Sequence, residues 1–259
     1  MENPNIEEIT SLQNPKVRKL LLLQQKSSER RDSGLFVVEG RRELMHCQEA
    51  GYEIDTVFTV DGDVDVRAGR VFRVTPAVYE KMAYRGGTEG VIAEVRTRKT
   101  GLNDLNLGEQ PLIVVLESVE KPGNLGAVLR SADAAGVDAV IVCDPLTDLY
   151  NPNLIRSSLG GIFSVPTVAC TSGEAIAWLK SKGIRILTAQ LQDSSLYYDT
   201  DMKGATAIVM GTESTGLTDI WRRAADAHIR IPMLGALDSL NVSVSAAILM
   251  FEAVRQRQK

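Results

Sequence analysis

The sequence is most informative at residues 231–245, Ile231-Pro232-Met233-Leu234-Gly235-Ala236-Leu237-Asp238-Ser239-Leu240-Asn241-Val242-Ser243-Val244-Ser245. This stretch combines an apolar strand end, a glycine-containing loop and several small polar side chains. Ser239, Asn241 and Ser243 can each cap a following helix, but one helix start uses only one of them. A segment that only connects two elements does not need so many polar groups, so we expect a ligand to bind here.

The residues after this stretch predict a helix with one buried stripe. Apolar side chains recur at helical spacing, which is typical of a helix that packs one face on a core. The predicted core-facing residues are Val244, Ala247, Ile248, Phe251 and Val254.

From residue 111 onward, apolar strand patterns alternate with helical patterns. Candidate strands are 112–116, 139–143, 167–170, 185–189, 207–210 and 228–231. This alternation predicts an α/β fold with a mainly parallel sheet and helices on both faces. Ligands of such sheets bind outside the carboxyl ends of the strands, so the loops that follow the strands are the candidate sites.

The loop after the first of these strands contains Asn124 and Arg130. We expect Asn124 to cap a helix that Gly136 ends. The neighbours of Arg130 are small or apolar, and a guanidinium in such surroundings needs an anion or several acceptors. A bound phosphate or ribose would satisfy it, and a salt bridge to Asp133 or Glu117 is the alternative.

A second loop follows the strand at 207–210. Gly211 and Gly216 permit a tight turn that brings backbone groups close to a ligand, with Glu213 directed inward. The alternative is an ordinary turn with Glu213 exposed to solvent.

The first hundred residues predict a separate small α/β domain. Helices are expected at 14–26, 41–50 and 76–83, and strands at 35–38, 56–60, 71–74 and 91–95. The segment 98–110 is poor in apolar residues and predicts a linker. The sequence therefore predicts a domain of residues 1–97, a linker, and a second domain of residues 111–259.

Charge is unevenly distributed along the chain. The 259 residues carry a net charge of −4, which as a whole does not favour nucleic-acid binding. Between residues 16 and 42, however, eight basic residues face three acidic ones, which predicts an RNA-contacting surface. The alternative is the solvated face of an amphipathic helix. The candidate RNA-binding residues are Lys16, Arg18, Arg30, Arg31, Arg41 and Arg42.

Several classes of protein are disfavoured by what the sequence lacks. It has no apolar run of membrane-spanning length and no basic or apolar leader, so we expect a cytoplasmic protein. The three cysteines are far apart and are expected to be reduced thiols. Neither a G-x-G-x-x-G nor a P-loop pattern occurs, and the two histidines are expected to be structural.

Three ordered motifs carry a family resemblance. They are Asn124-Leu125-Gly126 with Arg130, then Gly211-Thr212-Glu213 with Gly216-Leu217, then Ile231-Pro232-Met233 with Ser239-Leu240-Asn241-Val242-Ser243. In order and spacing they resemble the SpoU, or TrmH-like, branch of the SPOUT methyltransferases, over about residues 111 to 257. The segments Ser11-Leu12-Gln13-Asn14-Pro15-Lys16 and Phe36-Val37-Val38-Glu39-Gly40 resemble, more loosely, the L30e-like RNA-binding extension of ribosomal RNA members.

This resemblance implies an S-adenosylmethionine-dependent enzyme that methylates a ribose 2′-OH in RNA. It implies a C-terminal trefoil knot, an exception to the rule that connections do not thread loops, and a homodimer with the site near the subunit interface. No metal is required. The cofactor would contact Thr188, Ala189, Gly211, Ile231, Met233 and Leu240. The catalytic and substrate-positioning residues would be Asn124, Arg130, Glu213, Ser239 and Asn241.

The residues leave the substrate and one role open. The N-terminal extension favours 23S-type ribosomal RNA, and the alternatives are transfer RNA, a non-catalytic RNA-binding protein on the same scaffold, or a Rossmann-type oxidoreductase. Family mechanisms assign Arg130 as the base. Because a guanidinium normally stays protonated, stabilisation of the developing alkoxide and a grip on phosphate are equally good roles.

Overall fold

The structure is a computed structural model that describes residues 6–62, 64–84, 89–212 and 215–258. The chain divides into two compact units. The first is made of Met1–Lys99 and Tyr150–Phe163, and the second of Thr100–Leu149 and Ser164–Lys259. Both units combine strands and helices, which confirms the predicted α/β class.

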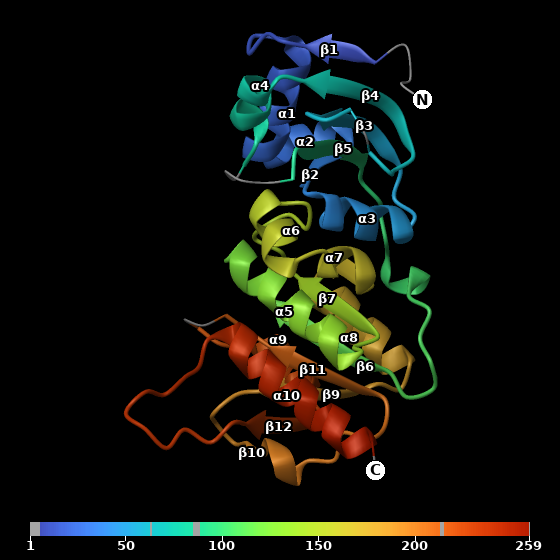
Figure 1. Cartoon of the computed structure of the whole chain (residues 1–259). Helices are drawn as coiled ribbons and strands as arrows, with labels where there is room; N and C mark the ends of the chain where they lie inside the picture. The colour runs from blue at the N-terminus through green and yellow to red at the C-terminus, as the bar shows by residue number, and fades with distance from the viewer. Residues whose placement is uncertain (1–5, 63, 85–88, 213–214, 259) are drawn as a thin grey trace. The chain divides into compact units, whose positions relative to one another are not determined.

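The first unit is built around a five-stranded sheet in the order β1-β4-β3-β5-β2. Strand β4 lies parallel to β1 and β3, whereas β5 is antiparallel to β3 and β2. Helices α1 and α4 supply Leu20, Leu23 and Val78 to the core against this sheet. The elements are β1 (Glu7–Ile9), α1 (Pro15–Gln25), α2 (Ser27–Ser33), β2 (Leu35–Glu39), α3 (Arg41–Glu49), β3 (Ile54–Thr59), β4 (Ala68–Val74), α4 (Pro76–Met82) and β5 (Val91–Arg96) (Figure 1).

Residues 150–163 group with the first unit although they are distant from it in sequence. The ring of Tyr150 stacks on Phe36 with 4.3 Å between centroids, and its hydroxyl donates to the carbonyl oxygen of Arg98 at 3.0 Å. Phe163 lies 6.1 Å from Phe36 by the same measure. The segment carries α6 (Pro152–Ser158) and most of α7 (Gly161–Ser164). Aromatic packing therefore places in the first unit a segment that the sequence assigns to the domain of residues 111–259.

Most of the predicted linker packs against the second unit. Residues 100–110 belong to the second unit and begin with the 3-10 helix η1 (Leu102–Asp104). Leu102, Leu105 and Leu107 lie against the apolar core of that unit. These three leucines pack the segment onto the second unit. The polar residues between them made the segment resemble a free linker in the sequence.

The second unit contains a seven-stranded sheet in the order β10-β12-β9-β11-β6-β7-β8. All six neighbouring pairs of strands are parallel, which confirms the predicted sheet. The two-residue strand β10 and the 3-10 helix η2 are too short to show a sequence pattern. The elements are β6 (Leu112–Glu117), α5 (Pro122–Ala135), β7 (Ala139–Cys143), β8 (Thr167–Cys170), α8 (Ser172–Ser181), β9 (Arg185–Ala189), β10 (Ser195–Leu196), η2 (Tyr197–Asp199), β11 (Thr206–Met210), α9 (Asp219–Ala224), β12 (Ala227–Arg230) and α10 (Val242–Arg257).

Helices cover both faces of this sheet, as the sequence predicts. On one face, Trp178 of α8 and Trp221 of α9 join a buried apolar cluster with alternate residues of β6, β7, β9 and β11. On the other face, α5 and α10 lie side by side, and α10 contacts β6 and β11 (Figure 1).

The orientation predicted for α10 is wrong. Its buried apolar residues are Val242, Ala246, Leu249, Met250 and Ala253, whereas Val244 and Phe251 of the predicted stripe are 47% and 48% exposed. The helix is apolar on almost every side, so spacing alone does not select the buried face. Glu252 and Gln256 are also buried on that face, where both are hydrogen-bonded. Gln256 donates to the carbonyl oxygen of Thr200 at 3.0 Å and to the Glu252 carboxylate at 2.8 Å.

The trefoil knot remains a prediction from the family resemblance. Among the described residues, no helix has both the length and the apolar character that a membrane crossing requires.

Candidate functional site

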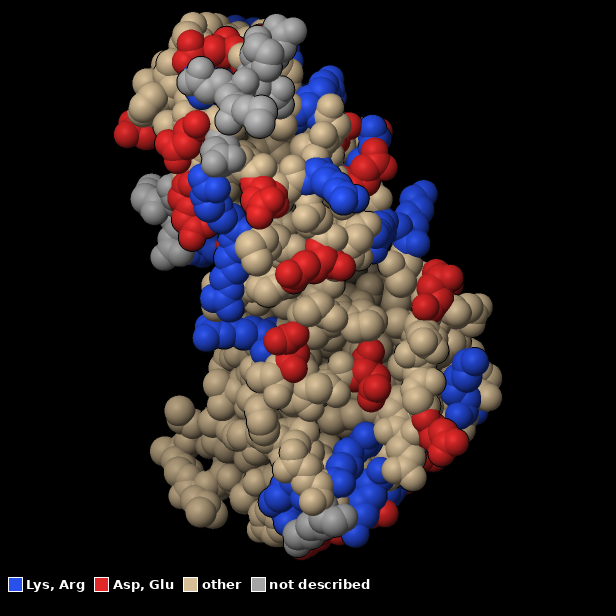
Figure 2. Space-filling view, turned by 45° about the vertical axis from the view of Figure 1, so that its right-hand side comes forward, with Lys and Arg blue, Asp and Glu red and all other residues tan. Residues whose placement is uncertain are grey.

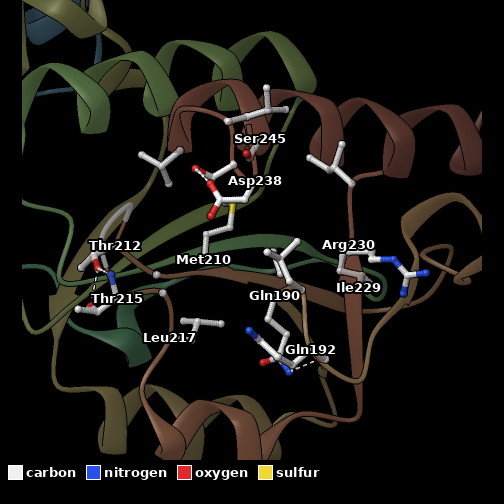
Figure 3. Close-up of a pocket in the computed structure, with 18 of the residues that line it drawn as sticks. Gln190, Gln192, Met210, Thr212, Thr215, Leu217, Ile229, Arg230, Asp238 and Ser245 are labelled. Carbon is white, nitrogen blue, oxygen red and sulfur yellow. Dashed lines mark hydrogen bonds between the residues drawn. The ribbon is translucent and has the colours of Figure 1, made fainter. Parts of the chain in front are cut away.

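A cavity of about 360 Å³ opens where the predicted site lies, at the carboxyl ends of β9, β11 and β12. Figure 3 shows side chains entering it from three directions, with Met210 at the end of β11, Gln190 after β9, and Asp238 from the loop before α10. Its volume falls within the roughly 300–1,000 Å³ typical of small-molecule sites. The lining residues are Ala189, Gln190, Leu191, Gln192, Met210, Gly211, Thr212, Thr215, Gly216, Leu217, Arg222, Ile229, Arg230, Ile231, Met233, Asp238, Ser239, Leu240, Val242 and Ser245.

Five of the six predicted cofactor residues line this cavity, namely Ala189, Gly211, Ile231, Met233 and Leu240. The sixth, Thr188, is fully buried and is not among the lining residues. Its hydroxyl lies 2.6 Å from Nδ1 of His228, the residue opposite it on β12. Thr188 therefore joins two strands next to the cavity, and His228 has the structural role that the sequence predicts.

The turn after β11 depends on two glycines. A Cβ atom at Gly211 would overlap the carbonyl group of Gly216, so no side chain fits there. Gly216 has a φ of +68°, which favours glycine. Thr212 closes the turn, because its backbone N–H donates to Gly216 and its hydroxyl accepts from the N–H of Thr215 at 3.0 Å. Glu213 lies outside the described residues.

Asn124 and Asn241 bring the first and third motifs together. The side-chain amide of Asn241 donates to Oδ1 of Asn124 at 3.2 Å, across 117 positions of sequence. Asn241 also caps α10, as predicted, because its Oδ1 accepts from the backbone N–H of Ser243 at 3.0 Å. These two amides form a polar pair beside the start of α10.

The predicted cap role of Asn124 is wrong. Helix α5 begins at Pro122, with Lys121 at the cap position, so Asn124 lies within the first turn. Proline suits the first helical position because it has no N–H to leave unpaired. The helix does end at Gly136, which adopts a φ of +63°. The side chain of Asn124 is thereby released from capping and is available to Asn241.

Arg130 lies on α5 and is exposed rather than buried. It forms no salt bridge with either predicted partner. Asp133 accepts from the hydroxyl of Ser164 at 2.6 Å, and the buried Glu117 accepts from Thr218. Arg130 and Asn124 are not among the residues that line the cavity, whereas Ser239 is. Among the described members of the predicted catalytic set, Ser239 therefore lies in the cavity wall, and Asn124, Arg130 and Asn241 lie outside it.

The cavity has polar lining residues that the motifs do not include. Gln190 and Gln192 follow β9 directly, Arg230 ends β12, and Arg222 lies on α9. Asp238 contributes the single carboxylate among the described lining residues. Four of these five residues could have been predicted from their position in the sequence. They lie within about three residues of a strand end or inside the stretch 231–245.

Arg30, one of the predicted RNA-binding residues, is 4% exposed. Its guanidinium donates to the carbonyl oxygens of Leu23 and Gln24 at 2.5 and 3.3 Å, at the end of α1. The last turn of a helix leaves such carbonyls without partners, so Arg30 stabilises the junction of α1 and α2. This burial contradicts its assignment to an RNA-binding surface.

The other predicted RNA-binding residues reach solvent. Arg18, Arg31 and Arg42 are exposed, and Lys16 and Arg41 are partly exposed. Lys16 lies 3.6 Å from the Glu7 carboxylate and Arg41 lies 3.7 Å from that of Asp61. Pairs of this kind at a surface are weak and leave the cations available to phosphate.

Comparisons with known proteins find relatives of both parts of the chain. The model of the SpoU rRNA Methylase family matches residues 111–251, and that of the MRM3-like substrate binding domain matches residues 14–93. The 23S rRNA (guanosine-2'-O-)-methyltransferase RlmB of Vibrio parahaemolyticus is 34% identical over 214 residues, covering 80% of this chain and 86% of the relative. The 23S rRNA (uridine(2479)-2'-O)-methyltransferase of Streptomyces viridochromogenes is 30% identical over 248 residues, covering 89% and 86%. The AdoMet-bound rRNA methyltransferase of Sinorhizobium meliloti superposes with a TM-score of 0.90 at 30% identity, over 96% of this chain and 98% of that one.

The close approach at Gly211 gives a first prediction. Gly211→Ala is expected to weaken S-adenosylmethionine binding by at least about tenfold, because the added methyl group displaces Gly216 and the cavity wall. Isothermal calorimetry measures the affinity. Gly173→Ala is the matched control, since a Cβ at that helical glycine meets nothing within 4 Å. Equal affinities in the two variants would contradict the prediction.

Fold, cavity and family models agree over the same residues. The model of the methylase family alone spans more than half of the chain, and its match includes every segment that lines the cavity. The chain therefore belongs to the SpoU rRNA methylase family.

Proposed function

We propose that this protein transfers a methyl group from S-adenosylmethionine to a ribose 2′-OH of RNA, with ribosomal RNA of the 23S type as substrate. The observation that carries the proposal is the cavity at the strand ends, which the second and third family motifs line. The close approach of Gly216 to Gly211, which leaves no space for a side chain, fixes the turn that forms one wall of the cavity. The similarity of residues 14–93 to a substrate binding domain, together with the names of the relatives, favours ribosomal over transfer RNA. That substrate implies a cytoplasmic location.

The residues around the cavity suit this chemistry. When bound, S-adenosylmethionine supplies an electrophilic methyl group on a sulfonium. The 2′-oxygen must be held in line with it and must lose its proton, because a neutral hydroxyl is a weak nucleophile. We assign Arg130 to the developing negative charge on that oxygen and to the adjacent phosphate, since a guanidinium offers fixed N–H donors. Asn124, Asn241, Ser239 and Glu213 are assigned to positioning of the ribose and the cofactor.

A homodimer completes this proposal. The outward face of α10 carries Val244 and Phe251, each about half exposed, and the loop before the helix exposes Leu234 and Leu237. Figure 2 shows that the projecting lower left of this face, where the loop of residues 231–240 lies, carries few charged side chains. Exposed apolar area of this kind marks protein interfaces. A second copy seated on α10 would bring the exposed Arg130 of neighbouring α5 close to the interface.

The test of the proposed activity is incubation with labelled S-adenosylmethionine and unmodified ribosomal and transfer RNA, followed by mapping of 2′-O-methyl sites. Label in ribosomal RNA is expected. Label in transfer RNA alone would establish the transfer RNA alternative, and no label in either pool with intact RNA binding would establish the non-catalytic one. Binding of NAD in place of S-adenosylmethionine would point to an oxidoreductase.

Arg130→Ala is expected to abolish turnover while the affinity for S-adenosylmethionine stays within a few-fold, because Arg130 lies outside the cavity wall. Single-turnover methylation and calorimetry measure the two quantities separately. Arg223→Ala, which removes an exposed arginine of α9 outside the cavity lining, is the control. Retained turnover in Arg130→Ala would remove this residue from the chemistry.

The basic residues of the first unit give a prediction about RNA affinity. The double variant Arg31→Glu and Arg42→Glu is expected to weaken RNA binding and to lower the salt slope by about 0.7–0.9 for each phosphate that these arginines neutralise. Titrations at several salt concentrations measure the slope. Lys180→Glu, at an exposed residue of α8 in the second unit, is the control. An unchanged slope would mean that Arg31 and Arg42 are only solvated.

The exposed face of α10 gives a prediction about assembly. Phe251→Asp is expected to convert a dimer to a monomer, because a carboxylate would be buried without a partner at the interface. Sedimentation velocity measures the mass. Ile220→Asp, at a residue of α9 that is 42% exposed, is the matched control. A wild-type monomer at micromolar concentration, or a dimer in both variants, would refute the assigned interface.

A further inference from the structure

A buried carboxylate lies directly behind the cavity wall. Glu117 ends β6 and is 3% exposed. Its Oε2 accepts from the backbone N–H of Thr218 at 2.8 Å, and its Oε1 accepts from the hydroxyl of Thr218 at 2.5 Å. Both oxygens of the Glu117 carboxylate therefore accept hydrogen bonds from Thr218, which is 101 positions away in the sequence. Hydrogen bonds to an ionised acceptor are the stronger kind, and leaving such a group buried without them is unfavourable.

Thr218 is the point where this interaction reaches the cavity. It directly follows Leu217, which is buried and lines the cavity, and it precedes α9, which carries the lining residue Arg222. The turn from Gly211 to Gly216 closes on itself through Thr212, so its far end needs a separate anchor. Glu117 supplies that anchor from the neighbouring strand, because β6 pairs with β11.

A second group of hydrogen bonds fixes the same region. The indole N–H of Trp221 donates to the hydroxyl oxygen of Ser172 at 2.9 Å. That hydroxyl has a single hydrogen to donate, and its oxygen lies 2.6 Å from the Asp144 carboxylate and 3.3 Å from that of Glu117, so Asp144 is the better-placed acceptor. Ser172 thus links α9 to the end of β7, and Thr218 links α9 to the end of β6. Glu117 has Thr218 as its principal donor.

The backbone at these strand ends is strained. Ser118 and Asp144, which directly follow β6 and β7, have φ values of +52° and +49°. Non-glycine residues persist there only where the surroundings hold them, and such positions cluster at functional sites. The N–H of Ser118 donates to the carbonyl oxygen of Cys143 at 2.9 Å, which holds the exit of β6 against β7. From Glu117 the chain passes through this position to α5, whose first turn carries Asn124.

We infer that Glu117 is a positioning residue for the cofactor cavity, acting through Thr218 without touching any ligand. Its carboxylate sets the place of Leu217 and α9 relative to the exit of β6, and so aligns the second motif with the first. This inference rests on the proposed function, because the cavity is taken as the S-adenosylmethionine site. A glutamine keeps an oxygen for the N–H of Thr218 but presents an NH2 group to its hydroxyl, so the two charge-assisted hydrogen bonds become weaker neutral ones.

The experiment compares Glu117→Gln and Glu117→Ala with Glu120→Gln, which changes an exposed glutamate of the loop that follows β6. Calorimetry without RNA is expected to give a Kd for S-adenosylmethionine raised about tenfold in Glu117→Ala and about threefold in Glu117→Gln, with Glu120→Gln unchanged. Steady-state assays of folded variants are expected to show a raised KM for the cofactor and an unchanged KM for RNA. Hydrogen exchange at the Thr218 amide is expected to accelerate in both Glu117 variants.

A folded Glu117→Gln with faster Thr218 exchange but wild-type cofactor affinity would overturn the inference, because Glu117 would then serve stability alone. If Glu117→Ala does not fold, Thr218→Val replaces it, since valine removes the hydroxyl donor and keeps the N–H. Thr218→Ser is the matched rescue and is expected to restore the affinity; equal affinities in these two variants would also overturn the inference. A wild-type protein that binds no S-adenosylmethionine would refute the proposed function instead.

Discussion

Parallel pairing of β9, β11, β12 and β6 is the constraint on which the rest of the second unit depends. It brings to one edge of the sheet the ends of strands that the sequence separates widely. The turn after β11, the residues that follow β9 and β12, and the start of α10 line the cavity at this edge. The requirement for glycine at position 211 and the strained backbone of Ser118 and Asp144 follow from this crowding of chain exits.

The sequence was sufficient for the regular part of this fold. Strands buried on both faces, such as β6, β7 and β11, appear as continuous apolar runs, and the six longer strands of the second unit were all predicted from the sequence. It was not sufficient for α10, where apolar residues surround the helix and the choice of face depends on what packs against it. Nor could it place residues 150–163, because the ring stacking of Tyr150 on Phe36 joins distant segments.

The candidate site shows the same division. Local geometry determines where the glycines, the apolar walls and the cap residue Asn241 lie. A sequence motif can therefore predict these features. Arg30 and Arg130 were misjudged in opposite directions, since the first is buried on helix carbonyls and the second is exposed. Side-chain environment decides both, and neighbours in sequence are a poor guide to it. Glu117 was noticed only as a possible partner of Arg130, although its donors lie on a different loop.

The position of β6 within the sheet affects how the protein is made. This strand ends at Glu117 and β11 begins at Thr206, yet the two pair directly at the centre of the sheet. During synthesis β6 can pair with β7 almost at once, while its other edge and the carboxylate of Glu117 remain unpaired until β11 and Thr218 have emerged. Long-range pairing of this kind folds slowly and leaves an open strand edge exposed for that time. The cofactor cavity cannot form until the chain as far as the start of α10 has been made, because its lining residues extend from Ala189 to Ser245.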